Sequence, residues 1–202
     1  MFYFFIVQLL NIFIRICFPF EVKGLENIEN IDGDFILCSN HLSNVDPLFF
    51  IVINFKIHRQ KIYFLAKKSI FKNFFINCIL DNMGAIPIDR RGVNNEKSLK
   101  RAENALRNKN SIGIFIEGTR SKTGKFLRPH SGAAFLAART KSKVLPVCIT
   151  PLHSHKVKIF RKTLISFGSP MLVLQDENPT IKEIKQVTVE IMRRIMDLRN
   201  LK

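Results

Sequence analysis

The most informative part of the sequence is Phe35-Ile36-Leu37-Cys38-Ser39-Asn40-His41-Leu42-Ser43-Asn44-Val45-Asp46-Pro47. Its first four residues form an apolar run, which predicts a short buried strand that ends where the polar residues begin. In an open α/β sheet, ligands bind in the crevice beyond the carboxyl ends of the strands. We therefore expect His41 to lie at such a crevice.

Asp46 follows His41 by five residues. A carboxylate that bonds one ring nitrogen of a histidine leaves the other nitrogen free to act as a general base. The pair alone leaves a second interpretation open, in which both residues only cap or pack the start of a helix.

Strand-like and helix-like runs alternate along the rest of the chain. The strand-like runs are 35–38, 61–66, 85–89, 112–116, 144–149, 155–160 and 164–167, the last two near the sheet edge. The helix-like runs are 69–80, 95–107, 132–140 and 180–198, and 47–54 is either helical or membrane-facing. This alternation predicts a single α/β domain with a mixed, largely parallel sheet flanked by helices.

The first twenty residues are almost entirely apolar and lack the basic start and cleavage site of a secretory signal. Gln8, Asn11 and Arg15 share one helical face, and an arginine at bilayer depth costs about 2.5–3.5 kcal/mol. We expect a helix that lies in or dips into one leaflet, with a full span and a buried core helix as alternatives. Residues 1–23 are thus predicted as a membrane-associated helix and 24–202 as the main domain.

The chain is both strongly basic and apolar. It has 32 Lys and Arg against 16 Asp and Glu, a net charge of +16, which implies an anionic partner such as nucleic acid, anionic lipid or a phosphorylated small molecule. Its 19 phenylalanines cluster with Ile and Leu rather than with basic residues on polar platforms. We therefore expect an anionic membrane surface as partner and no nucleic acid.

The four cysteines, Cys17, Cys38, Cys78 and Cys148, lie singly in apolar runs. This spacing predicts small buried hydrophobic residues in a reducing compartment, with no metal site and no disulfide framework. An acyl-enzyme on Cys38 is a rival chemistry, which burial disfavours because a thiol in apolar surroundings is inert.

Three polar clusters follow predicted strands, as His41 does. They are Lys67-Lys68, Arg90-Arg91 and Glu117-Gly118-Thr119-Arg120. In an open sheet all of them can face one crevice, and Gly118 permits close backbone approach or a turn with positive φ. A base, a carboxylate and several cations suit a phosphorylated substrate that must lose a proton.

Four sequence blocks occur in an order that resembles the glycerolipid acyltransferase family. The blocks are Asn40-His41 with Asp46, Gly84-Ala85-Ile86-Pro87-Ile88-Asp89-Arg90, Phe115-Ile116-Glu117-Gly118-Thr119-Arg120-Ser121, and Val144-Leu145-Pro146-Val147. The resemblance covers roughly residues 24–150 and the apolar N-terminus. Ile116 stands where the family often has proline, and the segment before Gly132 lacks the family's common lysine.

The resemblance implies direct acyl transfer from a thioester, acyl-ACP or acyl-CoA, to the sn-2 hydroxyl of 1-acyl-glycerol-3-phosphate in phospholipid biosynthesis. No cofactor is implied beyond that co-substrate, and the expected location is the cytoplasmic face of the cell membrane. His41 would be the base and Asp46 would orient it. The remaining residues that the resemblance implies are Arg120, Lys67 and Arg90 for the acceptor phosphate, Glu117, Gly118 and Thr119 for the acceptor pocket, and Asn40 for the loop and acceptor site. Pro146, at a strand end, is implied for the acyl pocket, with a purely structural role as the alternative.

Two alternatives stay open. Within the same chemistry, the acceptor is another lysophospholipid or glycerol-3-phosphate. Outside it, the chain is a non-enzymatic module of one of two kinds. A basic module that binds membranes explains the charge and the apolar N-terminus but not the gathering of His41, Glu117 and the cations at strand ends. A nucleic-acid binder explains the charge but not the apolar N-terminus.

Overall fold

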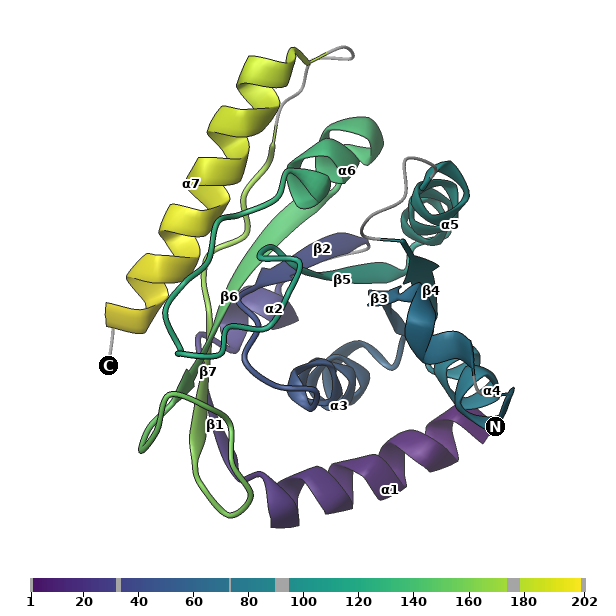
Figure 1. Ribbon diagram of the computed structural model, residues 1–202, viewed down its shortest axis with the longest axis vertical. Helices are drawn as coiled ribbons and strands as arrows, with labels where there is room; N and C mark the ends of the chain where they lie inside the picture. Colours follow the sequence, from purple (N-terminus) through teal and green to yellow (C-terminus); the bar gives the residue numbers. More distant parts are fainter. Residues whose placement is uncertain (1, 32–33, 73, 90–94, 174–178, 201–202) are drawn as a thin grey trace.

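The computed structural model describes residues 2–31, 34–72, 74–89, 95–173 and 179–200, and seven strands in these residues form one sheet (Figure 1). In the order β1-β7-β6-β2-β5-β3-β4 they are Phe20–Lys23, Thr163–Phe167, Lys143–Pro151, Phe35–Ser39, Ser111–Phe115, Ile62–Lys67 and Ala85–Ile88. The five strands from β6 to β4 are parallel, β7 is antiparallel to β6, and β1 is parallel to β7. The predicted mixed, largely parallel α/β sheet is confirmed.

Helices cover both faces of this sheet. They are α1 (Phe2–Cys17), α2 (Glu26–Glu29), α3 (Asp46–His58), α4 (Phe74–Asn82), α5 (Glu96–Arg107), α6 (Gly132–Thr140) and α7 (Ile181–Asn200), with a 3₁₀ turn η1 at Lys68–Lys72. Strand β2 shows the division, because Phe35 and Leu37 enter the core with α1 and α3, whereas Ile36 and Cys38 enter the core with α5, α6 and α7. The sheet is thus the middle of three layers.

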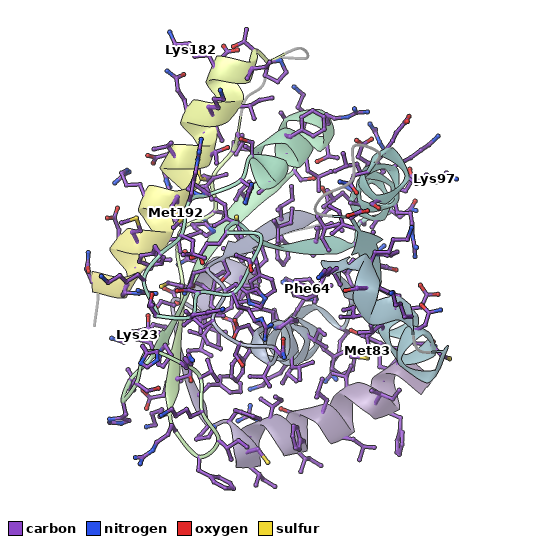
Figure 2. The ribbon with its side chains drawn as sticks, viewed as in Figure 1. Lys23, Phe64, Met83, Lys97, Lys182 and Met192 are labelled. Carbon is purple, nitrogen blue, oxygen red and sulfur yellow. The ribbon has the colours of Figure 1, made fainter. Side chains whose placement is uncertain are left out.

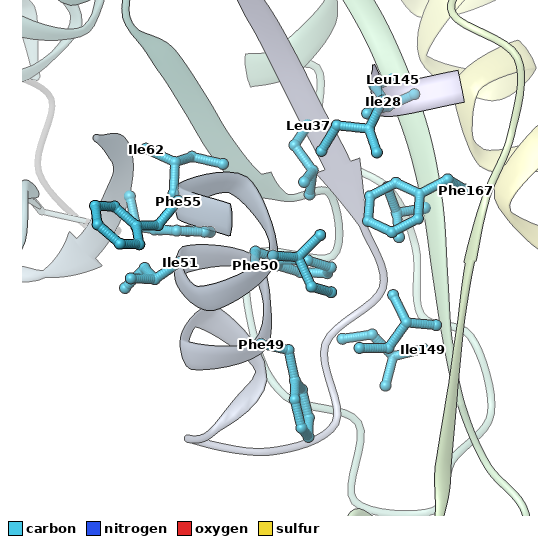
Figure 3. Packing of buried hydrophobic residues seen from close by; sticks show 14 of the residues in the cluster. Ile28, Leu37, Phe49, Phe50, Ile51, Phe55, Ile62, Leu145, Ile149 and Phe167 are labelled. Atoms are coloured by element: carbon cyan, nitrogen blue, oxygen red, sulfur yellow. The ribbon is translucent and has the colours of Figure 1, made fainter. Parts of the chain in front are cut away.

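Helix α3 is apolar on nearly every side because it is packed between α1 and the sheet. Pro47 lies in its first turn, where no backbone N–H is needed, and Phe49, Phe50 and Phe55 are buried (Figure 3). The membrane-facing alternative for this segment is therefore wrong.

Helix α1 is apolar on two sides. Tyr3, Val7 and Ile14 pack into the core with α3, while apolar side chains also project from the opposite side of the helix (Figure 2). Within the described part of the chain, no helix combines the length and the apolar character needed to cross a bilayer.

Three elements differ from those predicted. Residues 155–160 form bends and a turn rather than a strand, because Phe160 N donates to Cys17 O at the end of α1. The helix predicted over residues 1–23 ends at Cys17, and Phe20–Lys23 forms strand β1 instead, because it pairs with β7 far along the chain. The predicted helix over 69–80 is divided between η1 and α4.

Candidate active site

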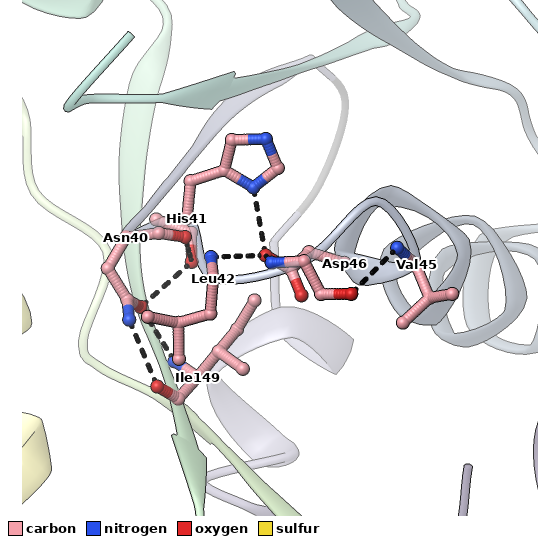
Figure 4. A network of polar contacts seen from close by, with 8 residues as sticks. Asn40, His41, Leu42, Val45, Asp46 and Ile149 are labelled. Atoms are coloured by element: carbon pink, nitrogen blue, oxygen red, sulfur yellow. Dashed lines mark hydrogen bonds and ion pairs between the residues drawn. The ribbon is translucent and has the colours of Figure 1, made fainter. Parts of the chain in front are cut away.

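His41 lies in the loop between β2 and α3, beyond the carboxyl end of the central strand. Its Nδ1 lies 2.8 Å from Asp46 Oδ2, and this oxygen also accepts hydrogen bonds from Leu42 N (2.6 Å) and Ser43 N (2.8 Å) (Figure 4). Asp46 is fully buried at the first turn of α3, where the helix dipole favours a negative charge. With Nδ1 donating to this carboxylate, Nε2 is the ring nitrogen left to accept a proton.

Asn40 holds the start of this loop against β6. Its Nδ2 donates to Ile149 O (3.0 Å), and its Oδ1 accepts from Ile149 N (2.8 Å) (Figure 4). The last paired residues of β2 and β6 are Ser39 and Val147, so the amide of Asn40 continues the ladder where the β2 backbone leaves it. Asn40 is fully buried, and both polar groups of its side-chain amide are bonded to the backbone of β6.

The loop that follows β5 is tied to the His41 loop. Ser121 N donates to His41 O (2.8 Å), and Ile116 N donates to Ser39 O (2.9 Å). The imidazole of His41, 8 % exposed, stacks on the ring of Phe115 with centroids 3.9 Å apart. The two blocks that are distant in sequence therefore form one site.

Phe115 also borders a hollow of about 700 Å³ beyond the ends of β3, β4 and β5. Its lining is Leu65, Lys67, Ile88, Asp89, Asn95, Ile114, Phe115, Ile116, Glu117, Gly118, Thr119, His130 and Gly132. Four of the predicted site residues, Lys67, Glu117, Gly118 and Thr119, are thus brought together. A second hollow of about 370 Å³, bordered by α1, β1 and α3, contains none of the predicted site residues.

Glu117 is 2 % exposed, and neither carboxylate oxygen has a hydrogen-bond partner of normal geometry among the described residues. Burial raises the pKa of Glu117 to about 7, the backbone of Leu127 and the charge of Arg199 lower it by less, and the charge of Asp46 adds to the rise. Glu117 therefore lies within electrostatic reach of the His41–Asp46 pair and changes protonation near neutral pH.

Gly118 turns the chain sharply after β5, with φ +63° and its N–H donating to Phe115 O (2.9 Å). A Cβ at this position would lie 3.0 Å from the ring of His130. A side chain here would therefore be strained by both φ and space, and the glycine lets the backbone approach His130.

The predicted cationic residues differ in their position relative to the hollow. Lys67 lines the hollow, whereas Arg120 is exposed, lies outside its lining and is adjacent in sequence to Ser121, which bonds His41. Arg90 and Arg91 lie outside the described residues.

Two further residues near the site were not predicted. His130 lines the hollow, and its position in a polar loop just before a helix start is the signal in the sequence that marks it. Arg199 reaches the site from α7, stacks over Phe126 at 3.7 Å and lowers the pKa of Glu117. It carries no local signal, because only tertiary packing brings the end of α7 here.

Pro146 is not at a strand end, so that expectation is wrong. Strand β6 continues to Pro151, and Pro146 is buried inside it, where its carbonyl accepts from Gly168 N (2.8 Å). The position gives Pro146 a packing role in the sheet, away from the 700 Å³ hollow.

The cysteines are partly as predicted. Cys38 and Cys148 are buried and Cys17 is half-buried, but Cys78 is exposed on α4, so burial was wrongly expected there. Burial raises the pKa of the Cys38 thiol far above its usual range. A thiol that resists ionisation is a poor nucleophile, so the acyl-enzyme alternative is disfavoured.

A histidine held by a buried carboxylate, beyond the central strand of a mainly parallel sheet, defines the class as an α/β protein with a candidate general-base site. The Acyltransferase family model matches residues 19–150, and the chain belongs to this family. The family predicted from the four sequence blocks is confirmed.

Related proteins agree with this family. The chain is 32% identical over 165 residues to a 1-acyl-sn-glycerol-3-phosphate acyltransferase of Borreliella burgdorferi, covering 81% of this chain and 62% of that protein. It is 27% identical to a protein of the same name from Bacillus subtilis, covering 86% of each. The fold resembles the crystal structure of the 1-acyl-sn-glycerophosphate acyltransferase of Thermotoga maritima, with TM-score 0.65, 22% identity and coverage of 95% and 80%.

Proposed function

We propose that this protein transfers a fatty acyl group from a thioester to the sn-2 hydroxyl of 1-acyl-glycerol-3-phosphate, giving phosphatidic acid. The family membership and the names of the related proteins support this activity. The observation that carries it is the His41–Asp46 pair, whose 2.8 Å contact directs one ring nitrogen to the carboxylate and leaves the other for a proton transfer.

In the proposed reaction, His41 Nε2 takes the proton of the acceptor hydroxyl while the hydroxyl oxygen attacks the thioester carbonyl. The ester C–O bond forms, the C–S bond breaks, and the imidazolium returns the proton to the leaving thiolate. Asp46 keeps the required tautomer and stabilises the imidazolium, as a carboxylate does in a hydrolase triad. The acceptor oxygen is itself the nucleophile, so no covalent enzyme intermediate is needed.

The acceptor would occupy the 700 Å³ hollow. We assign its phosphate to Lys67, which lines that hollow, and to Arg120 on the loop tied to His41. Glu117, with its unpaired buried oxygens, would bond a glycerol hydroxyl or a phosphate oxygen, while Gly118 and Thr119 shape the wall.

The donor would be acyl-ACP or acyl-CoA, used as a co-substrate. Both carriers are anionic and suit a chain with net charge +16. Because the acceptor is a lipid, we also propose that the protein works at the cytoplasmic face of a membrane and that the outward apolar face of α1 lies in the lipid interface.

The test offers the purified protein 1-acyl-glycerol-3-phosphate, other lysophospholipids and glycerol-3-phosphate, each with both donors. We expect turnover with 1-acyl-glycerol-3-phosphate, and Lys67→Ala should raise the KM for this acceptor with a smaller effect on kcat. Lys68→Ala is the matched control, since Lys68 is adjacent but lies outside the lining of the 700 Å³ hollow. Transfer to a different acceptor alone would contradict the proposed substrate.

A further inference from the structure

Large apolar side chains are exposed mainly at one place on the surface. Among the residues whose exposure the structure describes, six of them belong to α1, and two more, Ile159 and Phe160, belong to the loop between β6 and β7. The six on α1 are Phe4, Phe5, Leu9, Ile12, Phe13 and Ile16. The loop reaches the C-terminal end of α1, so the helix face and the loop tip lie close together on the same side of the molecule (Figure 1).

A hydrogen-bonded turn holds the two apolar residues at the tip of this loop toward the solvent. Arg161 N donates to Lys158 O (3.2 Å), which closes a turn with Ile159 and Phe160 at its two corners. Their side chains are 57 % and 70 % exposed, whereas Val157, just before the turn, is buried in the core and anchors the loop.

Phe160 also has φ +57°, a conformation that turns normally give to glycine or asparagine. The side chain of Phe160 buries little of its surface within this chain, although its backbone is strained. This placement points to a partner outside it.

Backbone hydrogen bonds fix the position of the loop tip relative to the end of α1. Phe160 N donates to Cys17 O (2.7 Å), and Thr163 N donates to Pro19 O (3.0 Å) just before β1 pairs with β7. Two backbone bonds and a strand pair therefore prevent the loop from moving independently of the end of α1.

The charges around the tip identify the partner. Residues 152–162 contain four cations, Lys156, Lys158, Arg161 and Lys162, and no Asp or Glu. Glu21 on β1 is an acidic residue near this rim, and it pairs with Lys162 (2.6 Å). Exposed apolar residues at the centre of a basic rim are typical of a surface that enters the interface of an anionic bilayer.

We propose that the Lys158–Arg161 turn is a second membrane anchor, which inserts Ile159 and Phe160 into an anionic lipid interface beside α1. This inference rests on the proposed membrane association of α1 and deepens it. A helix alone can roll about its own axis on a membrane. A second contact fixed beside one end removes that freedom, so the protein takes one orientation toward the lipid from which its acceptor comes.

The chain contains no tryptophan, so a single introduced indole reports on its own position. Phe160→Trp should show blue-shifted emission, and quenching by brominated lipid, when vesicles of phosphatidylglycerol and phosphatidylcholine are added. Ile181→Trp is the matched control, because Ile181 is 74 % exposed at the N-terminal end of α7, far from α1 (Figure 1). An indole at position 160 that stays water-exposed while the protein is vesicle-bound would overturn the proposal.

A second experiment measures vesicle binding by a variant that lacks the two apolar side chains of the proposed anchor. Ile159→Ser/Phe160→Ser should bind the same vesicles roughly 10- to 100-fold more weakly than the unchanged protein, since two partly inserted apolar side chains are lost. Leu172→Ser/Ile181→Ser, which removes two exposed apolar side chains elsewhere, should bind normally. Circular dichroism checks that both variants are folded.

A third variant, Phe5→Ser/Ile16→Ser, distinguishes the contribution of α1 to vesicle binding from that of the loop. If this variant binds weakly while the loop variant binds normally, α1 anchors alone and the second anchor is wrong. If neither variant loses affinity, the proposed membrane association of α1 is wrong as well.

Discussion

Asp46 bonds His41 through a single oxygen that accepts three hydrogen bonds. Asp46→Asn keeps the size of the side chain but removes its charge and alters which ring nitrogen of His41 carries the proton. We expect kcat to fall roughly 10²–10⁴-fold, the range that general-base catalysis contributes. Steady-state turnover, with the melting temperature as a folding control, measures this, and an unchanged kcat would remove Asp46 from the mechanism.

Glu117 makes the stability of the protein depend on pH in an unusual direction for a carboxyl group. Its pKa is about 7 in the folded chain against 4.5 for the ordinary group, so the folded state holds the proton more tightly than the unfolded state. The contribution of Glu117 to the free energy of unfolding is therefore fully present below pH 4.5 and is lost as pH rises through 7.

The difference in free energy of unfolding between wild type and Glu117→Gln should therefore change with pH. We expect wild type to lose on the order of 3 kcal/mol relative to the variant between pH 4.5 and pH 8. Urea unfolding of both proteins across this range measures the difference. Parallel pH profiles for the two proteins would contradict the raised pKa.

At the scale of elements, the site depends on the connection of the β2–α3 loop to β6. Asn40→Ala removes both bonds to Ile149 and leaves a buried N–H and a buried C=O with one partner fewer. We expect a loss of about 2–3 kcal/mol in the free energy of unfolding, and a lower kcat even where the protein is fully folded, because His41 is next in the chain.

Asn54→Ala is the matched control at the other end of α3. Asn54 is also buried, and its Nδ2 donates to Gln60 O (3.0 Å), so its removal destabilises the chain without touching the His41 loop. Equal reductions of kcat in the two variants, measured well below their melting temperatures, would show that Asn40 acts only through stability.

Elements with a local signal were predicted well. The helix at Gly132–Thr140 has the predicted bounds, and the capping box predicted for the last helix is present, with Thr180 N donating to Glu183 Oε2 (2.7 Å). Strand β2 and the position of His41 after it followed from one apolar-to-polar change. By contrast, β1 forms only through pairing with β7, and residues 155–160 have a strand-like pattern but are bonded to the end of α1.

In the candidate site too, residues with a local sequence signal were predicted and those placed only by tertiary packing were not. His41, Glu117 and Gly118 were predicted because each follows a strand of a parallel sheet, which brings such residues to one edge. Asp46 was predicted from its five-residue spacing to His41. Arg199 was not predicted, because no local sequence pattern indicates how α7 packs against the sheet. Pro146 was misplaced because it lies inside both the predicted run 144–149 and the observed strand β6, not at the end of either.

Across the whole molecule, the net charge of +16 should make the proposed membrane binding depend on salt. We expect binding to vesicles that contain phosphatidylglycerol to weaken as the salt concentration is raised from about 0.05 to 0.5 M, since screening shortens the reach of the charges. Binding to pure phosphatidylcholine should be weak throughout. Vesicle sedimentation measures both, and affinity independent of salt and lipid charge would contradict this account.

The central claim is that His41 removes the proton from the acceptor hydroxyl. The most direct measurement compares kcat for acylation of 1-acyl-glycerol-3-phosphate by wild type and by His41→Ala, with both proteins shown by circular dichroism to be folded. We expect turnover by wild type and a loss of at least about 10²–10⁴-fold in the variant. A folded His41→Ala protein with near-normal turnover would contradict it.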